Sequence, residues 1–240
     1  MKYIFVICFL MLGLMTACRQ ESKIQQHEVF VAGAMREVMR EGKLWANIKL
    51  DTLKPRAHLY GLGPSAYLNA ELLIMDGKVY RAEVRSDSSM LLKEDFTSEA
   101  PFFVYTHVAA WEAHTLPDTV FDLQSLEDYL HKISRNREKA FAFKLAGKAE
   151  FSLIHLVNLP VGAEVKSMSD AHQGKIQYAL EDYEVDMLGF FSTQHQGIFT
   201  HHDSFIHLHL ISKDLNWMGH VDELHFHEMQ LYLPAGIGFQ

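Results

Sequence analysis

The sequence contains very little cysteine, no cluster of basic residues and no apolar run long enough to span a bilayer comfortably. Its two cysteines among 240 residues, Cys8 and Cys18, both precede residue 19. Beyond that point, neither a disulfide framework nor thiol chemistry is available. Lysine and arginine number 22 against 30 acidic residues, which gives a net charge of −8 with histidine neutral. This acidic balance gives no support to nucleic-acid binding.

The N-terminal segment differs in composition from the rest of the chain. A single lysine precedes an apolar run over residues 3–15, which is typical of an export signal. The following Leu-Met-Thr-Ala-Cys, ending at Cys18, resembles the lipobox of bacterial lipoproteins, which implies cleavage after residues 1–17 and a lipid on Cys18. A plain secretory signal or an uncleaved signal anchor is the alternative. We expect a lipoprotein anchored to the membrane, facing the periplasm or the cell exterior, with residues 18–28 as a polar tether.

Residues 29–240 are predicted to form a strand-rich α+β domain. Hydrophobic residues make up 48% of the chain and charged residues 22%, which is ordinary for a globular protein. The expected architecture is either two sheet subdomains that share an interface or one barrel-like bifurcated sheet with a few short helices. The expected elements are helices over 29–42 and 125–136, a hairpin over 68–84 turning at Asp76-Gly77, a strand over 101–111, and mostly strands after residue 139.

Histidine is concentrated near the C-terminal end, where eight of the fifteen histidines fall at or after residue 195. His207 and His209 lie two apart in an apolar run, so on a strand their side chains point the same way. His220 follows after a turn and would complete a three-nitrogen site for Zn²⁺ or another divalent metal, with positions open for water or substrate. The alternative is a half-polar strand face without a metal.

The remaining histidines of this region are interpreted differently. His225 and His227 alternate onto the opposite face from His220 and are predicted to lie on the surface. His195, His201 and His202 fall in a polar stretch and are predicted to be ordinary loop residues.

Glu71 lies inside the apolar run Ala-Glu-Leu-Leu-Ile-Met. An ionised carboxylate buried there without a partner would cost several kcal/mol. A nearby metal, or a proton held at an active site, would explain it. The alternative is a solvent-facing position on an edge strand.

Four segments of the chain resemble the α-acetolactate decarboxylase family. They are residues 60–82, with Glu71 at the family's active-site glutamate; residues 100–108; residues 140–160; and residues 205–221, where the spacing from His209 to His220 matches the family's zinc segment. The resemblance implies a zinc enzyme, or one using another divalent metal. Its substrate would be a small 2-hydroxy-3-keto acid, 2-acetolactate, converted to (R)-acetoin and CO₂ through a metal-bound enediolate.

The resemblance also implies roles for individual residues. His207, His209 and His220 would hold the metal, and Glu71 would orient metal-bound groups or handle a proton. A second copy of the chain, as a homodimer, is a candidate partner.

The sequence departs from the family pattern at several positions. His155 aligns with an active-site arginine; it could still donate a proton but cannot supply a permanent charge and a two-pronged grip on a carboxylate. The alternative for His155 is a satisfied histidine on a half-buried strand. The family also brings a tail glutamate to the metal, whereas no acidic residue follows Glu228. Ala70, Pro64-Ser65 and a two-residue insertion before His207 predict a reshaped pocket.

These departures favour a second hypothesis, in which a diverged or non-catalytic zinc-binding lipoprotein binds a small oxygen-rich ligand. A cupin-like metal enzyme is a weaker third hypothesis, because Asp214 is only an approximate substitute for the carboxylate of that motif.

Overall fold

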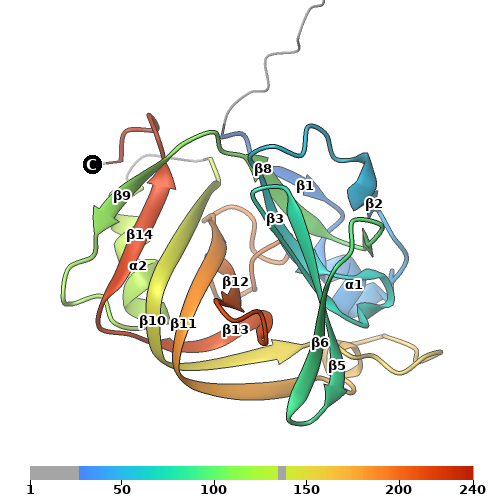
Figure 1. The fold of residues 1–240 in the computed structure, drawn as a ribbon. Coiled ribbons are helices and arrows are strands. Elements are labelled where there is room, and N and C mark those ends of the chain that lie inside the picture. The colour runs from blue at the N-terminus through green and yellow to red at the C-terminus, as the bar shows by residue number, and fades with distance from the viewer. Residues whose placement is uncertain (1–26, 135–138, 240) are drawn as a thin grey trace, which may run out of the picture.

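The computed structural model describes residues 27–134 and 139–239. The predicted signal peptide, Cys18 and the tether up to residue 26 therefore lie outside the described residues. Within the described ranges, no helix is long and apolar enough to cross a membrane. Two sheets face each other across the molecule, and short helices lie at its periphery (Figure 1).

The first sheet has six antiparallel strands, and the predicted hairpin supplies two of them. Asp76 and Gly77 have φ angles of 47° and 80°, which is the doubly positive pattern of a tight hairpin turn. The prediction for residues 68–84 is therefore confirmed. In spatial order the strands are β1 (Phe30–Ala32), β8 (Phe103–His107), β3 (Leu59–Pro64), β4 (Glu71–Met75), β5 (Lys78–Ser86) and β6 (Ser89–Glu94). A separate pair joins β2 (Ile48–Lys49) to β7 (Glu99–Ala100).

The second sheet is built around two long strands that curve together. Its order is β11 (Ile176–Phe191), β12 (Ile206–Ser212), β13 (Met218–His225), β10 (Phe141–Leu156), β14 (Met229–Pro234) and β9 (Trp111–Thr115). Strand β10 also pairs with β11 from one end to the other, and β12 and β13 lead from β11 back to β10. These four strands therefore close on themselves. Strand β10 continues through Gly147 without a break and is 16 residues long.

The three helices are short, and each buries some of its apolar residues against the rest of the molecule. They are α1 (Met35–Glu41), α2 (Leu123–Ile133) and α3 (Met168–Ala171), with 3-10 turns at Leu50–Thr52 and Ala66–Leu68. The helix predicted over residues 29–42 is shorter than expected, because residues 30–32 pair with β8 as strand β1. Helix α1 stops before Gly42 as predicted, and Gly42 caps it in the left-handed conformation that glycine adopts readily. Helix α2 begins earlier than predicted, because Asp122 is the N-cap and Ser125 completes a capping box with it.

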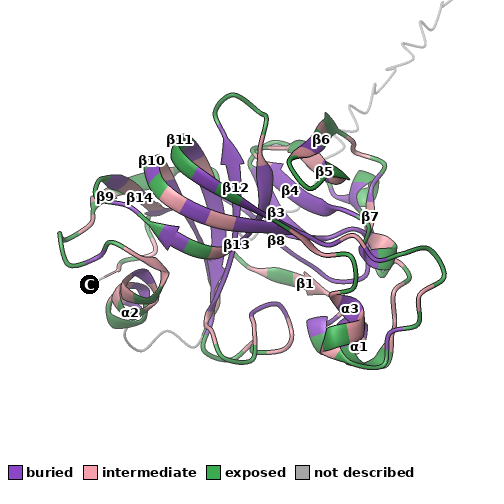
Figure 2. Cartoon of the chain, turned by 90° about the horizontal axis from the view of Figure 1, so that it is seen from below, coloured by how far each residue is buried: buried purple, intermediate pink, exposed green. Residues whose placement is uncertain are grey.

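One apolar core connects the two sheets. It includes Leu62 and Leu73 from the first sheet and Phe143, Leu188 and Leu208 from the second, all within 1% of complete burial. The strands carry continuous buried surface where the sheets meet (Figure 2). The predicted strand-rich α+β fold with a bifurcated sheet is confirmed, and the two sheets share a core.

The packing between β10 and β11 depends on a glycine. A Cβ atom at Gly189 would lie 2.2 Å from the ring of Phe143, its cross-strand partner, which is fully buried. We expect Gly189→Ala to lower the free energy of unfolding by about 1–3 kcal/mol, because the ring has no free space to move into. Urea unfolding measures the effect, with Glu181→Ala at an exposed position of β11 as the control. An unchanged midpoint for Gly189→Ala would contradict this account of the packing.

Candidate metal centre

The predicted metal-binding histidines lie where β12 and β13 face β4 of the first sheet. His209 of β12 and His220 of β13 are directly opposite each other, and His220 is in turn opposite His155 of β10. His207 lies two residues before His209 on the same face, as strand alternation predicts. The opposite face of β12 supplies Ile206, Leu208 and Leu210 to the core, so β12 is buried on both sides.

The three imidazoles converge to within the reach of a single ion. One ligand atom from each of His207, His209 and His220 lies within 4.8 Å of the other two. Nδ1 of His207 and both ring nitrogens of His209 are buried without a hydrogen-bond partner among the described residues. A cavity of about 20 Å³ lies beside His207 and His220, enough for one ion or water. His209 does not line this cavity, but its ring lies 5.0 Å from that of His207 and 5.5 Å from that of His220, measured between centroids. Buried imidazole nitrogens gathered in this way fit Zn²⁺, which binds nitrogen ligands well.

Burial keeps these imidazoles in the neutral form that a metal requires. The pKa of His209 falls to about 3, because burial and the nearby His155 disfavour the charged ring more than the backbone carbonyl of Leu72 favours it. Burial likewise holds the pKa values of His207 and His220 well below the usual range. All three rings therefore keep a lone pair available at neutral pH.

Glu71 points into the same site from β4. Only 3% of the residue is exposed, and β4 lies inside its sheet, so the alternative of a solvent-facing edge position is wrong. Its Oε2 lies 3.6 Å from Nε2 of His209. Burial raises the pKa of Glu71 to about 8, and Asp222 adds to this effect, although the backbone N–H of Val157 donates to the carboxyl group and opposes it. The Glu71 carboxyl group therefore lies beside the histidine cluster.

His155 is part of the site, and the structure supplies a partner for it that the sequence did not indicate. Its Nδ1 lies 2.7 Å from Oδ1 of Asp222, at a register shift between β10 and β13. Burial raises the pKa of Asp222, but the hydrogen bond and charge of His155 outweigh this and lower the pKa to about 2. Gln177 also donates to Asp222, at 2.8 Å. Nothing in the sequence pattern marked Asp222, because the pairing depends on this register shift.

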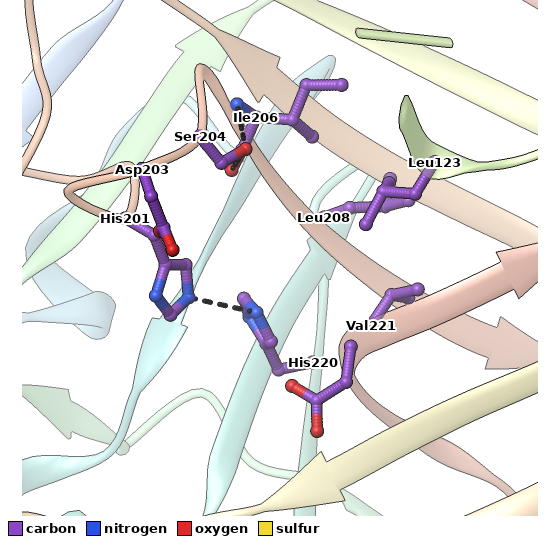
Figure 3. A pocket seen from close by; sticks show the side chains of 9 residues that line it. Leu123, His201, Asp203, Ser204, Ile206, Leu208, His220 and Val221 are labelled. Atoms are coloured by element: carbon purple, nitrogen blue, oxygen red, sulfur yellow. Dashed lines mark hydrogen bonds between the residues drawn. The ribbon is translucent and has the colours of Figure 1, made fainter. Parts of the chain in front are cut away.

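His201 is the second residue that sequence analysis missed. It lies in a loop as predicted, but its side chain turns inward and its Nε2 lies 3.1 Å from Nε2 of His220 (Figure 3). Burial, reinforced by His155, lowers the pKa of His201. His202, next to it, points outward and is 66% exposed. His225 and His227 are exposed, as predicted.

A second cavity adjoins the first at His201 and His220. Its volume is about 190 Å³, and its remaining wall combines apolar side chains from α2, β12 and β13 with Asp203 and Asp222 (Figure 3). Asp214, the cupin-like candidate, lies instead in the turn after β12, where Ser212 and Asn216 donate hydrogen bonds to it. The cupin-like arrangement is therefore not formed.

Comparison with known proteins gives consistent results. A curated α-acetolactate decarboxylase of Brevibacillus brevis is 24% identical over 204 residues, which cover 80% of this chain and 68% of that protein. An acetolactate decarboxylase structure from Bacillus subtilis strain 168 covers 86% of this chain and 84% of its own, with 21% identity and a TM-score of 0.72. A Staphylococcus aureus protein of unknown function, described as similar to α-acetolactate decarboxylase, gives 16% identity and a TM-score of 0.69 over 85% of this chain and 84% of its own.

The similarity to these solved structures establishes the fold alone, because the sequence identities are low. The family model establishes which family the chain belongs to. The model of α-acetolactate decarboxylase matches residues 29–237, almost all of the described chain. The predicted resemblance is thereby confirmed, and the chain belongs to the α-acetolactate decarboxylase family.

Proposed function

We propose that the protein decarboxylates 2-acetolactate, or a closely related 2-hydroxy-3-keto acid, to (R)-acetoin and CO₂ with a divalent cation, Zn²⁺ by preference. The observation that carries the proposal is the convergence of three buried, neutral imidazoles with Glu71, in a chain of this family. His207, His209 and His220 would hold the cation. When bound, it would polarise the hydroxyl and keto oxygens of the substrate and stabilise negative charge on them.

The reaction needs a proton donor after CO₂ leaves. The bond from C2 to the carboxylate carbon breaks, its electron pair stays behind in an enediolate, and a proton must then be added to carbon. Glu71 suits this role because its carboxyl group lies 3.6 Å from His209 inside the site, where burial raises its pKa. Only 3% of Glu71 is exposed, which limits the access of water to it.

His155 is proposed to contact the substrate from the β10 side of the site. Its Nδ1 donates to the carboxylate of Asp222, and this hydrogen bond fixes the ring. Nε2 is the ring nitrogen that is then left for the substrate. Asp222 is thus a positioning residue. In this arrangement Nε2 could bind or protonate the substrate, although a single ring nitrogen replaces the two-pronged contact that an arginine makes with a carboxylate.

We further propose that residues 29–240 form the catalytic domain and that Cys18 carries a lipid that anchors it outside the cytoplasm. The support is the lipobox-like sequence that ends at Cys18. An apolar leader precedes it, and a polar tether follows it before the domain begins.

The metal proposal is tested by the metal content of the full-length protein. We expect stoichiometric zinc in the wild type and its loss in His207→Ala and in His220→Ala, because each variant removes a buried nitrogen ligand. His227→Ala is the matched control, since its ring is 81% exposed and belongs to the second His-x-His pair. Full metal content in both site variants would refute the assignment. Stoichiometric zinc without acetoin from racemic acetolactate would instead indicate the non-catalytic zinc-binding protein.

The role of His155 is tested by restoring the arginine of the family. We expect His155→Arg to raise kcat/KM roughly 10- to 100-fold, because a charge-assisted hydrogen bond to the substrate carboxylate contributes about 1.5–3 kcal/mol. His155→Ala should lower activity, and Asp222→Asn should lower it less while zinc stays bound. Steady-state acetoin formation measures all three variants. Full activity in His155→Ala would remove His155 from the reaction.

The anchor is tested by lipid labelling in a bacterial host. We expect incorporation of radiolabelled fatty acid into the wild type and none into Cys18→Ala, because the thiol is the acylated group. Cys8→Ala should label normally. Equal labelling of the wild type and Cys18→Ala would argue against the lipoprotein assignment.

A further inference from the structure

His172 lines the metal-binding cavity but has no role in the proposed mechanism. It follows helix α3 in the connection between β10 and β11, and it shares the ion-sized cavity with Glu71, His155, His207 and His220. It is partly buried, and its ring forms no hydrogen bond with another described residue. Either ring nitrogen can therefore carry the N–H and donate it to a ligand that enters the cavity.

The neighbouring His155 cannot donate to a carboxylate in its neutral form. Its Nδ1 already donates to Asp222, so Nε2 keeps only a lone pair unless the ring is doubly protonated. A carboxylate accepts hydrogen bonds and is repelled by a lone pair. The rings of His155 and His172 are 6.4 Å apart between centroids and inclined at 71°, so a carboxylate that enters beside His155 is also within reach of His172.

The environment of His172 keeps its ring neutral. Burial lowers its pKa, and the charges of Lys175 and His155 add to this effect, although Asp222 opposes it. A neutral N–H orients a carboxylate without strongly stabilising its negative charge. Such a donor suits a decarboxylation, because a group that stabilised the charge of the bound carboxylate strongly would lose that interaction as CO₂ forms and so raise the barrier.

The segment that carries His172 is attached on two sides. Helix α3 buries Ala171 in an apolar cluster that includes Met35 of α1, and the two helices lie next to each other (Figure 2). Beyond His172, Nζ of Lys175 lies 3.5 Å from Oδ2 of Asp222 on β13. A segment held by a helix before the histidine and by an ion pair after it can present an imidazole at a defined position.

The walls of the cavity can yield to a ligand. Its present volume is about 20 Å³, and part of its wall consists of Met35 and Met39 from α1. Methionine is unbranched and has three rotatable bonds, so these two side chains can change conformation to admit a larger molecule beside the histidines.

We propose that His172 binds the carboxylate of the substrate through a hydrogen bond from its ring. This inference rests on the proposed function, because the ligand that it requires is the carboxylate of a 2-hydroxy-3-keto acid. His172 would hold that carboxylate while the hydroxyl and keto oxygens stay at the metal-binding histidines, so the bond that breaks lies between two fixed ends. When CO₂ forms, His172 loses its anionic partner, which favours release of the gas.

The test compares two stable probes by titration calorimetry with full-length, zinc-loaded protein. The acid, 3-hydroxy-3-methyl-4-oxopentanoate, keeps adjacent hydroxyl and keto oxygens, and its carboxylate is one carbon further away, so it does not lose CO₂. The ketone, 3-hydroxy-3-methylbutan-2-one, lacks the carboxylate. We expect His172→Ala to weaken binding of the acid roughly 10-fold, because a hydrogen bond to a charged group is lost, and to leave the ketone unchanged. Gln173→Ala, at the next and exposed position, should match the wild type with both probes.

Two further variants separate a hydrogen-bond donor from a packing residue. His172→Gln keeps an N–H donor and should recover part of the affinity for the acid, whereas His172→Phe keeps a planar ring without a donor and should recover none. Bound zinc should stay stoichiometric in all of these variants. In steady-state acetoin formation, His172→Ala should raise KM more than it lowers kcat.

Equal losses for the acid and the ketone in His172→Ala, or wild-type affinity for the acid in His172→Phe, would overturn the inference. If the wild type also forms acetoin, the proposed function would still stand. A wild type that prefers the acid through His172 but forms no acetoin would instead overturn the proposed function and leave this inference in place.

Discussion

Three imidazole rings and a carboxyl group are buried together between the two sheets, and this burial sets the chemistry of the whole site. Charged groups lose their hydration there, so the rings of His207, His209 and His220 stay neutral and Glu71 keeps its proton. Neutral rings keep their lone pairs, and several of those nitrogens have no partner within the described chain. Buried polar groups without partners are costly, and a divalent cation would match this set of nitrogens chemically.

The strands deliver these groups because β10 and β11 pair over their full length and curve together. Their curvature brings β12 and β13 into a closed arrangement, in which His209, His220 and His155 occupy consecutive cross-strand positions. Side chains that are distant in sequence thereby become neighbours on one face. The apolar face of β12 packs into the core that also holds the first sheet, and this contact positions β4 and Glu71 against the histidines.

The residues that differ from the family pattern lie in the outer part of the site. The resemblance aligns His155 with an arginine of the family, and the structure shows that its ring is held by Asp222. His201 enters from a loop whose ends are fixed by α1 and α2. Both residues contact His220, so changes at the edge of the site converge on one metal-binding candidate.

Features that depend on local periodicity and turn chemistry could be predicted from the residues alone. Alternation placed His207 and His209 on one face, Asp76-Gly77 specified a hairpin, and the apolar neighbours of Glu71 indicated a buried carboxyl group. The pattern of neighbouring residues was enough to predict these three features, because each one is set within a few residues of the chain. The contacts of Asp222 with His155 and of His201 with His220 arise only from the way the chain folds. The first contact depends on a register shift between two strands, and the second on a loop held by two helices, and neither leaves a periodic signal in the chain.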